Sequence, residues 1–329
     1  MTTLFKKKTN FRILKVLIVL STYTFVIYKI NNSVESSQFI LDNFSLSRTK
    51  YAILIIVLQL MIVNWVFEAV KWKILVKDIK EINLKHSLRS VLAGISIGIF
   101  TPNRIGEFAG RPYFTDSSKM VSGVFASIIG SLSQSFITIT VGIFAINAYL
   151  IDTENKLFIS KYYIYLILTL SILLIILIAY AFFKPSFLIK LKSKFGLLKK
   201  KEKELHFLKF YKFKDLRNIL TFSFFRYTIF FTQFYLLLIF FNIEISVFHA
   251  FIAVGLIYLF LFIIPGFALS EIGVRGSLAI FFLGLYSSDY PAILSASILL
   301  WIVNLAFPAI LGTFIVMREP LKKNLSRKG

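Results

Sequence analysis

Long apolar segments separated by short polar ones form the dominant pattern of the chain. About 20 consecutive apolar residues in an α-helix cross the roughly 30 Å hydrocarbon core of a membrane. Because lipid offers the backbone no hydrogen-bond partners, such segments are expected to be helices. The sequence therefore predicts an all-α, polytopic helical membrane protein, in keeping with its 57% hydrophobic residues and its mean hydropathy of +0.77. The six predicted spans lie near residues 12–30, 51–70, 120–150, 161–183, 217–241 and 291–317.

Two further apolar segments are shorter or interrupted. Residues 87–100 run into the motif "TPNRIGEF", and residues 247–264 run into "PGFALSEIG". The first segment is too short to cross a membrane alone, and proline and glycine at its end stop a helix. We therefore predict that each segment is one arm of a broken hairpin that enters the membrane and returns.

The distribution of charge predicts the orientation of the chain. Lys and Arg crowd the cytoplasmic loops of membrane proteins, which accounts for the net charge of +22 without a nucleic-acid partner. The basic segments are residues 6–15, 71–89, the loop 184–217 and the C-terminus, whereas 31–50 and 151–161 carry mixed charge. Both termini are therefore predicted to be cytoplasmic. The N-terminal apolar run lacks a small-residue cleavage site and is interpreted as a retained first span.

Counting crossings between these loops predicts two related halves in a single domain, residues 1–329. Neither hairpin can add a net crossing, so each half (1–150 and 151–329) contains three spans and one broken re-entrant hairpin, eight helical units in all. The first half begins inside and the second outside. This is an inverted repeat, an arrangement common in secondary transporters. The basic loop 184–217 is interpreted as a topology determinant that can also attract anionic lipid.

Charged residues in the two hairpins are the candidate binding site. If the segment after Pro102 is helical, Arg104, Glu107 and Arg111 share one face, and Glu271 and Arg275 share another. A charge at the membrane centre costs about 2.5–3.5 kcal/mol, so such groups pair or line a wet cavity. Two interpretations are compatible: the pairs hold the hairpins together, or they line a cavity for an anionic headgroup. The supporting turn residues are Pro102, Gly106, Gly110, Pro265, Gly266 and Gly273.

The two hairpins are expected to differ in their charge balance. In the first, two arginines flank Glu107, so one cation lacks a local partner, and this hairpin is expected to carry more of the headgroup affinity. In the second, Glu271 and Arg275 balance each other, which favours a role in gating or assembly. Glycines at 94, 98, 106 and 110 are expected to permit close approach of a backbone or a headgroup.

Other polar residues within the spans could line a cavity, but interhelical packing is the favoured interpretation for each. They are Asn64, Glu68, Gln134, Arg226, Gln233 and Asn304, of which Glu68 and Arg226 can also reach the cytoplasmic interface. The chain has no cysteine, and its three histidines are far apart. We therefore predict no metal, no cofactor and no catalytic residue.

The first motif, "TPNRIGEFAGR", resembles that of the lysylphosphatidylglycerol synthase transmembrane-region family, also called flippase-like domain proteins. Members typically show Pro-x-Arg-x-Gly-Glu and a following Arg, here Pro102, Arg104, Gly106, Glu107 and Arg111. The second motif keeps Pro265, Gly273 and Arg275 but has Gly276 where the family often has Glu. The resemblance implies a protein of the bacterial plasma (inner) membrane that moves a charged lipid between leaflets. Full-length synthases carry a further aminoacyltransferase domain; this chain stops at Gly329, so no synthase activity is expected.

Three functions remain open on the sequence. The first is a flippase for an anionic or otherwise charged phospholipid or lipid-linked headgroup, with membrane lipids as partners. The second is an integral-membrane enzyme of lipid-phosphate metabolism, although no Asp-x-x-Asp motif for a metal is present. The third is a non-transporting partner of another membrane protein.

Overall fold

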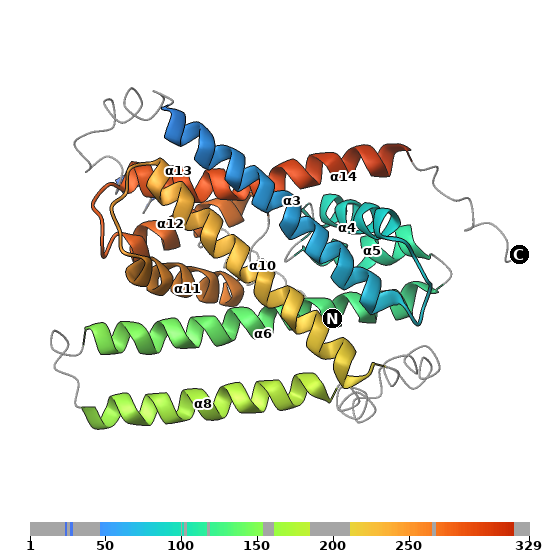
Figure 1. Cartoon of the computed structure of the whole chain (residues 1–329), viewed down its shortest axis with the longest axis horizontal. Helices are drawn as coiled ribbons and strands as arrows, with labels where there is room; N and C mark the ends of the chain where they lie inside the picture. Colours follow the sequence, from blue (N-terminus) through green and yellow to red (C-terminus); the bar gives the residue numbers. More distant parts are fainter. Residues whose placement is uncertain are drawn as a thin grey trace, which may run out of the picture.

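The computed structural model describes residues 24, 27–28, 47–99, 101, 104–116, 119–153, 161–184, 211–264 and 268–318. Helices and short connections make up these residues, and no strand occurs among them (Figure 1). An all-helical protein is therefore confirmed. Nearly all of the predicted span 12–30 and most of the basic loop 184–217 lie outside the described residues.

Five helices are long and apolar enough to cross a membrane. Their bounds are α3 (Arg48–Val76), α6 (Met120–Asp152), α8 (Lys161–Phe183), α10 (Phe213–Phe240) and the continuous run Tyr290–Arg318. At 1.5 Å per residue, the 29 residues of α3 measure about 43 Å, more than a hydrocarbon core requires. The last run is not uniform, because a π-helical turn, η4 (Ile302–Ala306), joins α13 (Tyr290–Trp301) to α14 (Phe307–Arg318).

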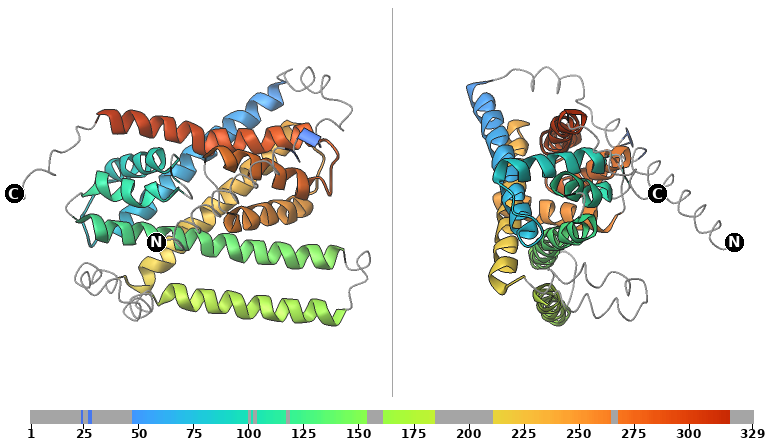
Figure 2. Two further views of the ribbon diagram at one scale, coloured as in Figure 1. Left: turned by 180° about the vertical axis from the view of Figure 1, so that it is seen from behind. Right: turned by 90° about the vertical axis from the view of Figure 1, so that its right-hand side faces the viewer.

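Two pairs of shorter helices take the places of the predicted hairpins. The first pair is α4 (Leu84–Ile99) with α5 (Gly106–Thr115), and the second is α11 (Val247–Ile263) with α12 (Ala268–Leu283). With 16 residues in α4 and 17 in α11, these arms reach only about 24–26 Å. The pairs lie at opposite ends of the bundle, at right and left of Figure 1 and exchanged in the rear view of Figure 2.

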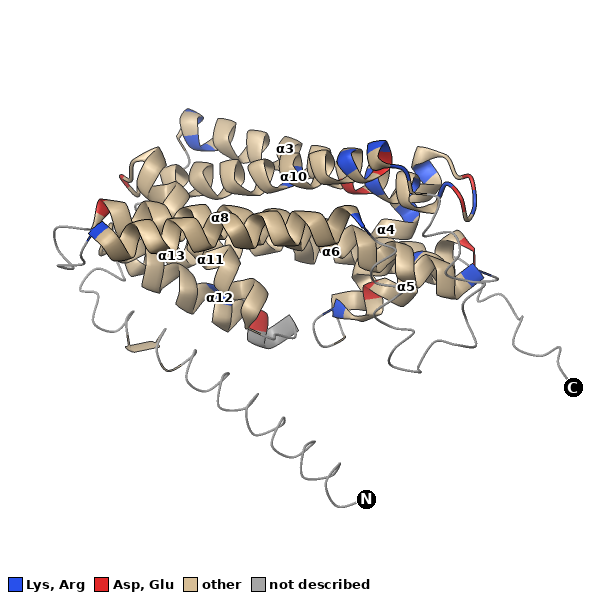
Figure 3. Ribbon diagram, turned by 90° about the horizontal axis from the view of Figure 1, so that it is seen from below, with Lys and Arg blue, Asp and Glu red and all other residues tan. Residues whose placement is uncertain are grey.

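Helices α3 and α10 cross the bundle antiparallel to one another. Lys77, just after α3, pairs with Asp215 in the first turn of α10 at 2.6 Å. Near the middle of the two helices, Arg226 donates from Nε to Asn64 Oδ1 at 2.8 Å. The basic segment 71–89 and the start of α10 therefore lie at one end of the bundle, where Figure 3 shows lysines and arginines gathered.

Each short pair packs on the last long helix of the other half of the chain. Helix α4 lies on α14, and α11 lies on α6. Glycines allow both contacts: a Cβ on Gly312 would strike the carbonyl oxygen of Leu92, and a Cβ on Gly142 would lie 2.7 Å from Leu259 Cβ. A side chain larger than hydrogen would separate these helices. The packing of a short helix from one half on a long helix from the other therefore depends on small residues, as in other membrane helix contacts.

Helix α8 contributes little to the packed interior. Ile164 is its one buried residue, and the rest of the helix is exposed or half-buried. It lies beside α6 (Figure 1). With no amphipathic pattern and an apolar surface all round, this helix is typical of one that faces lipid.

Candidate functional site

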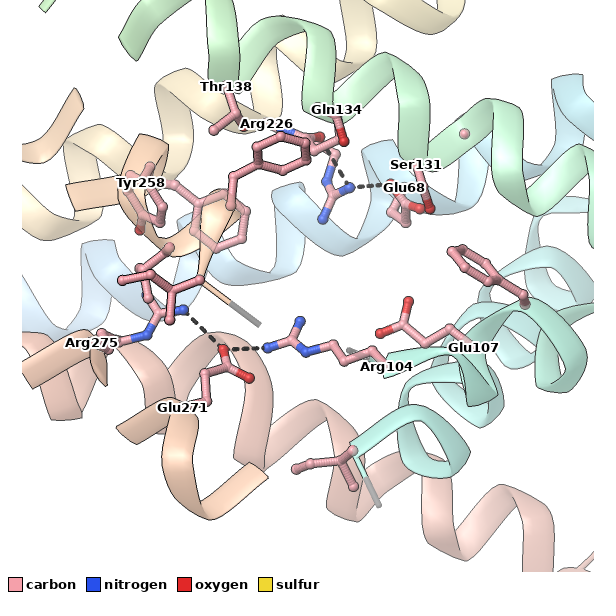
Figure 4. A pocket seen from close by; sticks show the side chains of 18 of the residues that line it. Glu68, Arg104, Glu107, Ser131, Gln134, Thr138, Arg226, Tyr258, Glu271 and Arg275 are labelled. Carbon is pink, nitrogen blue, oxygen red and sulfur yellow. Dashed lines mark hydrogen bonds and ion pairs between the residues drawn. The ribbon is translucent and has the colours of Figure 1, made fainter. Parts of the chain in front are cut away.

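A cavity of about 590 Å³ lies between α3, α6, α10 and the inner ends of both short helix pairs. Eight charged side chains line it among the described residues, an unusual number for the interior of an apolar bundle. They are Lys71 and Arg111, together with six that are labelled in Figure 4: Glu68, Arg104, Glu107, Arg226, Glu271 and Arg275.

The buried carboxylate of Glu68 on α3 is the centre of the first cluster. Its Oε1 accepts from Nη1 of Arg111 on α5 at 2.5 Å, and its Oε2 pairs with Lys71 Nζ at 2.8 Å. Arg226 on α10 also donates to Oε2. One carboxylate thus holds three cations from three helices, with only 3% of its side chain exposed.

Neighbouring polar groups fix these cations in place. Arg226 takes Asn64 as a further acceptor, and its guanidinium lies 5.7 Å from the ring centroid of Trp65. Lys71 donates to the carbonyl of Gly130 on α6 at 3.3 Å and to Ser223 Oγ on α10 at 3.4 Å. Hydrogen bonds of this kind to charged groups are worth about 1.5–3 kcal/mol each, which makes the cluster rigid.

Glycines on α4 make room for the charged side chains of α5. A Cβ on Gly94 would lie 2.5 Å from Cγ of Arg111, and one on Gly98 would strike Cγ of Glu107. Glu107 then accepts from Arg111 Nη2 at 3.0 Å. Gly94 and Gly98 therefore do permit close approach, as predicted, and the groups that approach them are side chains of the protein itself, Arg111 and Glu107.

The turn between α4 and α5 directs Arg104 away from its own helix. Thr101 Oγ1 accepts the backbone N–H of Gly106 at 2.8 Å and so caps the start of α5. Arg104 precedes that start with φ 54°, a left-handed conformation that is uncommon outside glycine. Its side chain reaches the second pair, where Nη2 meets Glu271 Oε1 at 2.7 Å.

The second cluster is built on the carboxylate of Glu271. The same Oε1 that Arg104 contacts also accepts from Nη2 of Arg275, one turn later on α12, at 3.1 Å. Figure 4 shows both guanidinium groups pointing at this carboxylate from opposite sides. Residues 167 positions apart are thereby joined, and the inner ends of the two short pairs meet at the cavity.

The structure corrects three expectations about these residues. Arg104 does not share a helical face with Glu107 and Arg111, because α5 begins only at Gly106. Neither arginine that flanks Glu107 lacks a partner: Arg104 pairs with Glu271, and Arg111 pairs with two carboxylates. Glu271 and Arg275 are not a self-contained pair, because Glu271 also serves Arg104.

All five predicted site residues, Arg104, Glu107, Arg111, Glu271 and Arg275, line the one cavity. Of the supporting residues, Gly106 begins α5, Gly110 packs against Gly94, and Gly273 is buried inside α12. The remaining three, Pro102, Pro265 and Gly266, lie outside the described residues.

Three further charged residues line the cavity. A cavity role was the less favoured interpretation for Glu68 and Arg226, and no site role was predicted for Lys71. A signal was present, because Asn64, Glu68 and Lys71 recur at helical spacing on one face of an otherwise apolar span. Gln233 and Asn304 do make the interhelical bonds expected of them: Asn304 donates to Gln233 at 3.1 Å, and Gln233 donates to the Val57 carbonyl at 2.8 Å.

The cavity suits an anion better than a cation or a metal. Five basic side chains face three carboxylates around it, a surplus of two positive charges. Within the described part of the chain, no group of three or more His, Cys, Asp or Glu side chains is placed to hold a metal ion. Arginine forks are suited to phosphate oxygens, which they bind in a bidentate manner.

Comparison with known proteins identifies one family. The family model described as "Lysylphosphatidylglycerol synthase TM region" matches residues 13–312, most of the 329-residue chain. A search of curated proteins finds no match.

Proposed function

Since the chain belongs to the lysylphosphatidylglycerol synthase TM region family, we propose that it is a flippase that moves an anionic lipid between the two leaflets of the membrane. Membership makes it a membrane protein related to lipid metabolism or flipping.

The observation that carries the proposal is the positive surplus of the cavity. Charges inside an apolar bundle are costly unless they are compensated, and among the described residues that line the cavity five basic groups meet three acidic ones. An anionic headgroup that moves through the cavity supplies the missing compensation. Its acyl chains can remain in the surrounding lipid, because the lining also includes Phe108, Phe230 and Leu261.

The arrangement of the short helix pairs supports alternating access to this cavity. We propose that the α4–α5 pair enters the membrane from the cytoplasmic side and the α11–α12 pair from the outside, as in an inverted repeat. The pairs lie at opposite ends of the bundle, and the Arg104–Glu271 ion pair joins them at the cavity. When this ion pair breaks, the cavity can open toward one leaflet at a time. The headgroup then gains access from each leaflet in turn.

A leaflet-exchange assay tests the proposal. Purified protein is reconstituted into liposomes containing a trace of phosphatidylglycerol labelled on one acyl chain, and dithionite quenches the label in the outer leaflet. We expect complete quenching with protein and about half in empty liposomes. The same label on phosphatidylcholine should be exchanged more slowly.

Matched variants separate transport from leakage. Arg111→Gln removes a cavity cation and should slow exchange, whereas Arg217→Gln removes an exposed arginine at the start of α10 and should not. Equal rates for protein-containing and empty liposomes would reject a flippase. If chromatography shows that the lipid has been converted to a new species, the result favours an enzyme instead.

A further inference from the structure

We infer that the headgroup bound in this cavity carries two negative charges, as in a phosphate monoester or a diphosphate ester, with one charge at each of the two clusters. The inference rests on the proposed function and adds the substrate class. It derives from the way in which the surplus charge is divided between the clusters.

Each cluster alone has one cation more than it has carboxylates. In the first, Glu68 and Glu107 meet Lys71, Arg111 and Arg226. In the second, the single carboxylate of Glu271 meets Arg104 and Arg275. All eight side chains line the same cavity, so a bound molecule can contact both clusters at once.

The sequence between the helices of each short pair contains no acidic residue. Positions 100–105 read FTPNRI, and positions 264–267 read IPGF. A phosphodiester with one negative charge compensates only one cluster. A phosphate monoester carries about −1.5 to −2 at pH 7, enough for both.

The donors of the second cluster are available to such a ligand. The side chain of Arg104 is 38% exposed although it pairs with Glu271, so part of its guanidinium faces open space. Within the described residues, the buried Nε of Arg275 has no hydrogen-bond acceptor. Both groups are charged donors of the kind that bind phosphate oxygens most strongly.

Competitive lipid binding measured by native mass spectrometry tests the inference without requiring transport. The protein in detergent is mixed with equal amounts of phosphatidate, a phosphate monoester, and phosphatidylglycerol, a phosphodiester, with identical acyl chains. We expect phosphatidate to be retained about tenfold better, the equivalent of one further charge-assisted hydrogen bond. Inorganic phosphate is added in a separate arm: if it displaces phosphatidate at equal concentration, the site takes free phosphate and the lipid assignment is wrong.

Variants of opposite sign make the test specific for charge. Arg104→Gln lowers the surplus from two to one and should abolish the preference for phosphatidate. Glu107→Gln raises the surplus to three and should increase it, while Arg111 keeps Glu68 as a partner. Arg217→Gln, on the exposed start of α10, should leave the preference unchanged. Melting curves identify any variant that fails to fold, and the Glu107 variant then carries the test alone.

The outcomes distinguish this inference from the proposed function. Equal retention of the two lipids by the parent protein, or the same direction of change in the Arg104 and Glu107 variants, overturns the two-charge assignment and leaves leaflet exchange intact. A clear preference for phosphatidate without any exchange in liposomes supports the site and rejects transport.

Discussion

Replacing Glu68 with glutamine should destabilise the protein more than any other single loss of a cavity carboxylate. Its two oxygens hold Arg111 at 2.5 Å and Lys71 at 2.8 Å, and Oε2 also holds Arg226. Glutamine keeps the shape but removes the charge that compensates three buried cations. Removing one partner of a buried ion pair costs about 3–5 kcal/mol. At about 2–4 °C per kcal/mol, the melting temperature should fall by about 6–20 °C.

Tryptophan fluorescence in detergent is a suitable readout, because two of the three tryptophans, Trp65 and Trp72, lie on α3 within one turn of Glu68. Glu107→Gln is the matched control in the cavity: Arg111 retains Glu68, so the loss should be about 1 kcal/mol. Glu244→Gln, on the exposed segment after α10, should change stability by no more than about 0.5 kcal/mol.

A double variant tests the electrostatic origin of the effect. Glu68→Gln combined with Arg226→Gln removes one cation together with the carboxylate and should melt at a higher temperature than Glu68→Gln alone. If Glu68→Gln melts within about 2 °C of the parent, less than 1 kcal/mol is lost and the three cations do not depend on this carboxylate. If the double variant melts lower than the single one, loss of packing explains the result better than charge does.

Three further predictions concern the helix pairs. The chain has no cysteine, so a single introduced cysteine can be labelled specifically. Ile105→Cys and Ile263→Cys, both at exposed positions, should react with a membrane-impermeant maleimide from opposite sides of the membrane. Reaction of both from one side contradicts the proposed topology. Gly94→Ala places a methyl group 2.5 Å from Cγ of Arg111 and should reduce lipid exchange at least as strongly as Arg111→Gln. Unchanged exchange would show that the arginine side chain has room to move. Arg111→Lys should exchange lipid more slowly than the parent at an unchanged expression level, because one ammonium group cannot reproduce a fork that holds two carboxylates; full activity excludes a role for the fork.

The sequence was sufficient to predict the five long helices that the structure describes, the two short pairs, and five of the eight charged residues that line the cavity. Apolar runs of membrane length and the two interruptions by proline and glycine determine the long helices and the short pairs. The ion-pair partners of each charged residue could not be predicted, because they depend on tertiary geometry. Nothing in the local spacing indicates that Arg104 adopts a left-handed backbone and reaches Glu271, 167 residues away.

Glu68 shows a second limit of sequence reasoning. A single acid near the polar end of an apolar span is compatible with an interfacial position, where a long side chain reaches water. Only the antiparallel packing of α3 on α10 brings Arg226 to it, and only the α4–α5 turn brings Arg111. The π-helical turn around Asn304 was likewise unpredicted, because its sequence, "IVNLA", is compatible with an ordinary α-helix.

The packing of α4 on α14 and of α11 on α6 connects the two halves of the chain, which has a consequence for folding and for movement. A fragment ending at residue 153 contains α4 without α14 and α6 without α11, so each of its contact faces lacks the helix that covers it. Neither half is therefore expected to be an independent folding unit, whereas two co-expressed fragments can complement one another without the peptide bond between them. The same interlocking means that a tilt of α14 carries α4 with it and a tilt of α6 carries α11, so both ends of the cavity change shape in a single motion.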